Sequence, residues 1–113
     1  VIVMPADVAP FVLTGTFNEW GETPFEIVDG LMIAKNISFD DNDTFKIKLA
    51  KMSDDDNWNG GYNLGSNGQS ITPGEYYHPT NGTNINISTS VTGTYDITFD
   101  IKNNSIIMTA SQN

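Results

Sequence analysis

The segment Tyr95-Asp96-Ile97-Thr98-Phe99-Asp100-Ile101 alternates large apolar and polar side chains without interruption. This period of two is typical of a β-strand buried on one face, because successive side chains of a strand point to opposite faces of the sheet. A turn at Asn103-Asn104 follows, and a second apolar run extends from Ile106 to Thr109. The end of the chain therefore predicts two neighbouring strands joined by a tight turn.

The same alternation recurs toward the start of the chain, between turns rich in Gly, Asn and Asp. Asp29-Gly30 predicts a two-residue hairpin, because both residues tolerate positive φ. On the strand after it, one buried face is expected for Leu31, Ile33, Ile37 and Phe39. Further expected strands are Phe11 to Gly15, a short one starting at Phe25 and Ile27, Thr44 to Leu49, and Ile85 to Ile87. Seven or eight strands at this spacing predict an all-β chain folded as an antiparallel, immunoglobulin-like β-sandwich.

Length and composition limit the possible functions. A chain of 113 residues is long enough for one core, and we expect residues 11–113 to form one domain after a linker or edge segment at residues 1–10. The formal net charge is −9, with five Lys and no Arg, so a nucleic acid partner is not expected. The absence of Cys excludes disulfides and thiolate metal sites.

Residues for catalysis or metal binding are poorly placed. The single histidine, His78, lies beside a proline in a polar stretch and is interpreted as an exposed loop residue. The carboxylates gather in turns such as Asp54 to Asp56, whereas a glycosidase needs two of them across one bond. The run Asp40 to Asp43 lacks the later Gly and Glu of an EF-hand loop. We therefore expect no enzyme, no metal and no cofactor.

Two tryptophans in polar surroundings are more informative. Trp20 follows Asn18-Glu19, and Trp58 lies between two asparagines within a long irregular stretch from Ser53 to Gly82. A large ring in a loop marks either a binding surface or a lid on the core. Lys46 and Lys48 are expected to point outward from one strand, where their ammonium groups can donate hydrogen bonds to sugar hydroxyls.

The segment Gly15-Thr16-Phe17-Asn18-Glu19-Trp20 resembles the Gly-x-Phe-Asn-x-Trp start of starch- and glycogen-binding modules. The order of later residues agrees with that pattern: a Phe-Lys strand at Phe45-Lys46, then Trp58, then Asn84 or Asn86. The departure is Ile47, where the modules often have an aromatic residue.

The distal half is similar to the starch-binding domains of SusE/SusF-type outer-membrane lipoproteins of Bacteroidetes, through Trp58, Tyr62, Gly65 and the closing segment 93–102. This resemblance implies that Trp20 and Trp58 form an aromatic arc against an α-glucan. It also implies hydrogen bonds to glucose from Lys46 or Lys48, with Lys48 slightly favoured, and from Asn84 or Asn86.

From this resemblance we expect non-catalytic binding of starch or malto-oligosaccharides by a monomeric domain. The parent protein would be a polysaccharide-capture protein, lipid-anchored at the outer membrane or secreted, with other modules and uptake proteins as further partners. Three alternatives stay open at this point. The domain is a structural spacer with buried indoles, it binds a different polysaccharide, or it is a glycoside hydrolase.

Overall fold

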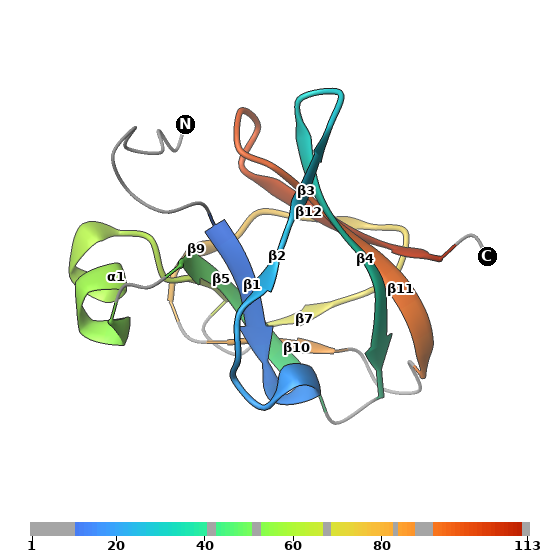
Figure 1. Cartoon of the computed structure of the whole chain (residues 1–113), viewed down its shortest axis with the longest axis horizontal. Helices are drawn as coiled ribbons and strands as arrows, with labels where there is room; N and C mark the ends of the chain where they lie inside the picture. Colours follow the sequence, from blue (N-terminus) through green and yellow to red (C-terminus); the bar gives the residue numbers. More distant parts are fainter. Residues whose placement is uncertain are drawn as a thin grey trace.

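Two β-sheets form the two layers of the molecule (Figure 1). The computed structural model describes residues 11–40, 43–50, 53–66, 69–82, 84–87 and 92–111. Sheet A has the order β2-β1-β5-β10-β7, with β6 paired to β5 and β9 paired to β6, and sheet B has the order β3-β4-β11-β12-β8. The expectation of an all-β, two-layer sandwich is confirmed.

The strands of sheet A are β1 (Phe11–Gly15), β2 (Thr23–Pro24), β5 (Thr44–Leu49), β6 (Leu64–Gly65), β7 (Ser70–Ile71), β9 (Thr80–Asn81) and β10 (Ile85–Ile87). Those of sheet B are β3 (Glu26–Val28), β4 (Leu31–Phe39), β8 (Tyr76–Tyr77), β11 (Gly93–Asp100) and β12 (Ser105–Ala110). A 3-10 turn, η1 (Thr16–Asn18), follows β1, and a helix, α1 (Asp54–Gly60), follows β5. Several of these strands have only two residues, so the described part of the chain contains more strands than the seven or eight expected.

The core lies between the sheets and is built from the inward faces of their long strands. Phe45, Ile47 and Leu49 of β5 are fully buried, as the alternation of that strand predicts. Aromatic rings connect the layers: Phe11 of β1 meets Phe99 of β11 edge to face, with ring centroids 5.5 Å apart. Such pairs add to the stabilisation from apolar burial.

The expectation for the first half of β4 is wrong. Met32 and Ala34 are buried, whereas Leu31 and Ile33 lie on the outer face and are half-buried. The register with β11 shifts by one residue between Ala34 and Ile37, so the strand contains a β-bulge that reverses its alternation. Asn36 takes the left-handed conformation there with φ 59°, and its backbone N–H donates to Asp96 Oδ1 at 2.9 Å.

The sequence prediction has opposite outcomes for two other segments. Asp29 and Gly30 have φ of 52° and 81°, so the predicted hairpin with two positive φ values is confirmed. The stretch from Ser53 to Gly82, expected to be irregular, instead holds α1 and four two-residue strands. Ser53 caps α1 by accepting a hydrogen bond from the N–H of Asp56, and Gly61 ends it in the left-handed conformation.

Candidate functional site

The turn after β1 contains the Gly-x-Phe-Asn-x-Trp segment, and its glycine is required by close strand packing. A Cβ atom on Gly15 would lie 2.8 Å from the Cα and Cβ atoms of Phe45 on the neighbouring strand. Real Cβ contacts of that length essentially do not occur, so any larger residue would separate β1 from β5.

Asn18 connects the whole turn through its side-chain amide. Its Oδ1 accepts a hydrogen bond from the N–H of Gly15 at 3.0 Å. Its Nδ2 lies within hydrogen-bond distance of three acceptors: the carbonyls of Leu13 and Gly21, each at 3.2 Å, and Thr23 Oγ1 at 2.8 Å. These bonds hold the end of β1 against the start of β2. Asn18 therefore has a structural role.

The two aromatic residues of the segment differ in their surroundings. Phe17 packs against the core, with its ring centroid 5.2 Å from that of Phe39. Trp20 remains 47% exposed. Its backbone is fixed, because its N–H donates to Gly15 O at 2.8 Å, and both Glu19 and Trp20 are left-handed, with φ of 56° and 63°. A bulky residue in this conformation is strained.

The two lysines lie where the alternation of β5 predicts them. Lys46 and Lys48 are half-buried on the outer face of sheet A, opposite Thr14 and Val12 of β1. Those two β1 residues are themselves buried although they face away from the core. Along β1, the outer face of sheet A therefore exposes little of Val12 and Thr14 to solvent, and the two lysines lie on the neighbouring strand β5.

The two predicted asparagines lie on and next to β10. Asn86 is opposite Thr44, so it shares the outer face of sheet A with Lys46, two residues further along β5. Asn84 precedes the strand, and its carbonyl accepts a hydrogen bond from Ser66 Oγ at 3.0 Å. Both asparagines are half-buried. Continued by one residue, the same register places Asn84 opposite Lys46, so both asparagines are neighbours of this lysine.

Trp58 lies on α1 rather than in a loop, and the helix is fastened to the end of β5. Asn57, fully buried, accepts a hydrogen bond at its Oδ1 from the N–H of Leu49 at 2.8 Å, and its Nδ2 donates to Ser53 O at 3.1 Å. Asn81 Nδ2 donates to the carbonyl of Trp58 at 2.8 Å. The Trp58 side chain remains 46% exposed.

The structure does not place the backbones of the two tryptophans side by side. Trp20 is bonded to Gly15, which is opposite Phe45 at the start of β5, whereas α1 is bonded to Leu49 at its end. Four residues of strand correspond to about 13 Å. Figure 1 shows the same separation, with α1 to the side of the sheet and the blue turn of η1 at its lower end. Lys46 and Asn86 belong to the Trp20 end, and Lys48 is closer to the Trp58 end.

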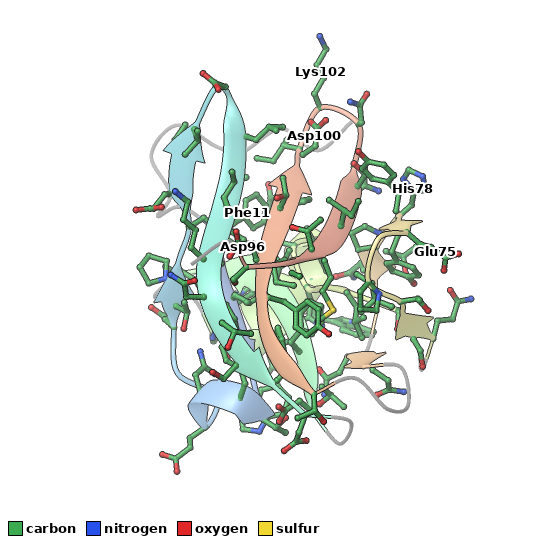
Figure 2. The ribbon with its side chains drawn as sticks, turned by 90° about the vertical axis from the view of Figure 1, so that its right-hand side faces the viewer. Phe11, Glu75, His78, Asp96, Asp100 and Lys102 are labelled. Atoms are coloured by element: carbon green, nitrogen blue, oxygen red, sulfur yellow. The ribbon has the colours of Figure 1, made fainter. Side chains whose placement is uncertain are left out.

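Other chemistry-bearing residues lie elsewhere. His78 is exposed near β8, and its Nδ1 hydrogen-bonds to the carbonyl of Asn104 at 2.8 Å. Figure 2 shows it at the edge of sheet B, with Lys102 at the tip of the β11–β12 hairpin. Within the described ranges, no three His, Asp or Glu side chains are grouped so that they could hold a metal ion. No helix among the same residues is long and apolar enough to cross a membrane.

Sequence reasoning did not single out Asn57, which lies beside the candidate site, or the exposure of Tyr76 on the other sheet. Asn57 was not distinguished from the other asparagines around Trp58, although its position four residues after the helix cap Ser53 was a usable signal. Tyr76 is 69% exposed on β8, a strand of sheet B. Its exposure depends on strand pairing, which the local sequence does not reveal.

Comparison with known proteins gives no relative. No family model matches the chain, and neither a curated protein nor a solved structure is significantly similar to it. Function must therefore be argued from the side chains of the site.

Proposed function

We propose that this domain binds α-glucan, as starch or malto-oligosaccharide, without catalysing its breakdown. The observation that carries the proposal is the exposure of Trp20. In its segment Gly15, Phe17 and Asn18 are used for strand packing, core packing and hydrogen bonding, whereas the indole is half exposed on a strained backbone. Strain of this kind is often retained for function.

The chemistry around Trp20 suits a neutral sugar. An exposed indole can stack on the apolar C–H face of a pyranose, as aromatic rings do in binding sites. Lys46 and Asn86 lie on the adjoining outer face, where an ammonium group and an amide can bond hydroxyl groups. Stacking with a few hydrogen bonds gives modest affinity, roughly in the micromolar to millimolar range.

The finer parts of the proposal follow the resemblance of the sequence. We propose an immunoglobulin-like strand arrangement for the sandwich, and a monomeric module within a larger capture protein at the outer membrane or outside the cell. Several linked modules would retain a polymer better than one, because later contacts become intramolecular.

The test is a titration of tryptophan fluorescence with maltoheptaose, with cellohexaose in parallel. We expect a saturable shift with the malto-oligosaccharide alone, and a much weaker shift in Trp20→Ala. Tyr76→Ala is the matched control, since it removes an exposed aromatic ring from sheet B. A response to cellohexaose alone would assign a different polysaccharide, and no response to either would favour the structural spacer.

A further inference from the structure

We infer that Trp20 and Trp58 are two separate contact points for glycan and that one long chain engages both, in place of a single curved site lined by two rings. This inference rests on the proposed function and specifies its ligand as a long chain.

The two tryptophans are attached to the fold separately. Trp20 is held at the start of β5 through Gly15, and Trp58 is held at its end through Asn57 and Leu49. The hydrogen bond that holds Trp20 and the one that holds α1 have no residue in common.

Both indoles are partly open to solvent. They are exposed to nearly the same extent, 47% for Trp20 and 46% for Trp58. In the part of the chain that the structure describes, the close ring pairs consist of Phe and Tyr only. The two indoles are not stacked on each other in any of these pairs, so each can contact a different part of a ligand.

Strand β5 connects the two attachment points. The outer face of β5 carries Lys46 toward the Trp20 end and Lys48 toward the Trp58 end. Side chains with hydrogen-bond donors thus lie on the strand between the two attachment points. A trisaccharide would occupy one contact point, whereas a chain long enough to follow β5 would reach both. Linkage of two weak contacts raises the affinity for the longer ligand, because the second contact forms at a high effective concentration.

The experiment compares maltotriose with a linear maltodextrin of about sixteen glucose units, on wild type, Trp20→Ala and Trp58→Ala. Each variant keeps one indole, which reports by fluorescence on its own end. We expect the indole that each variant keeps to shift on binding maltotriose at its own end, whereas the end that lost its indole no longer contributes to the signal. We also expect wild type to bind the long chain about tenfold tighter than either variant, as two linked weak contacts allow.

Three outcomes would overturn the inference. Loss of maltotriose binding in both variants would indicate one shared arc, and loss in only one would indicate a single contact point; either result leaves α-glucan binding intact. Equal binding of the long chain by wild type and both variants would show that the ends are not linked. If wild type bound neither sugar, the proposed function itself would fail. Circular dichroism and thermal unfolding of each variant verify that it is folded.

Discussion

At the scale of single residues, the turn at residues 15–20 separates structural from available side chains. The backbone of β5 leaves no room for a side chain at Gly15. Asn18 forms hydrogen bonds to atoms on both sides of the turn. Trp20 combines exposure with a left-handed backbone, so the fold gains little from its ring. The two kinds of residue should respond oppositely to mutation.

Trp20→Gly is expected to leave the free energy of unfolding unchanged or to raise it by up to about 1 kcal/mol, because glycine takes positive φ without strain. Retention on immobilised amylose should fall in the same variant. Urea denaturation and affinity electrophoresis measure the two quantities. A loss of stability of more than about 2 kcal/mol would show instead that the indole caps the sandwich, as in a spacer.

Asn18→Ala is expected to lower the free energy of unfolding by about 2 kcal/mol, because it leaves the N–H of Gly15 and the carbonyls of Leu13 and Gly21 without this partner. Glu19→Ala is the control, since that neighbouring side chain is exposed in the same turn. Urea denaturation of both variants tests the difference. Equal stabilities would contradict the role assigned to Asn18.

At the scale of elements, the β-bulge within β4 and helix α1 after β5 decide where side chains point. The bulge of β4 turns Ile37 and Phe39 toward the core after Met32 and Ala34. Helix α1 has only seven residues, too few to be stable alone, and depends on its attachment to β5. The bulge and the helix each rely on an asparagine.

Asn57→Ala should destabilise the attachment of α1, because the N–H of Leu49 loses its acceptor in a buried environment. We expect a loss of about 2 kcal/mol in stability. Asn59→Ala is the matched control, because Asn59 lies on the same helix and is exposed. Thermal unfolding followed by circular dichroism compares the two, and an equal Tm would disprove the dependence of α1 on this side chain.

Asn36→Gly should keep or raise the Tm, whereas Asn36→Val should lower the stability by at least about 1 kcal/mol. A β-branched side chain is strongly disfavoured at positive φ, while glycine is not. Differential scanning calorimetry of the pair measures the effect. A tolerated valine would mean that the bulge can move to another residue of β4.

At the scale of the whole molecule, charge is the dominant property. A formal net charge of −9 on 113 residues means that the folded chain repels itself, and salt screens this repulsion. A neutral glucan has no charge to be repelled or attracted. Stability and binding should therefore differ in their dependence on ionic strength.

Raising NaCl from about 10 mM to about 150 mM shortens the Debye length from about 30 Å to about 8 Å. We expect the Tm to rise by about 2–4 °C, with the Kd for maltoheptaose unchanged within about twofold. Thermal melts and fluorescence titrations at both salt concentrations provide the measurement. A Kd that changed steeply with salt would point to an anionic ligand.

The strands could be predicted wherever alternation is uninterrupted, as in β5 and β11, because a strand with one buried face repeats every two residues. The outward placement of Lys46 and Lys48 followed from the same rule. The bulge in β4 and helix α1 could not be predicted in this way. The bulge depends on the hydrogen bond from Asn36 N–H to Asp96 on another strand, and α1 depends on the hydrogen bond from Leu49 N–H at the end of β5 to Asn57.

The sequence by itself determined the all-β class, the long strands, the hairpin at Asp29-Gly30 and the candidate residues of the site, since these follow from local periodicity and side-chain chemistry. Only the tertiary structure decided which candidates are neighbours. The pairing of β5 with β1 and β10 places Lys46 and Asn86 on one face, and the attachment of α1 moves Trp58 to the far end of β5. Distances between segments are set by which strands pair and by buried hydrogen bonds between segments, and local periodicity does not reveal either.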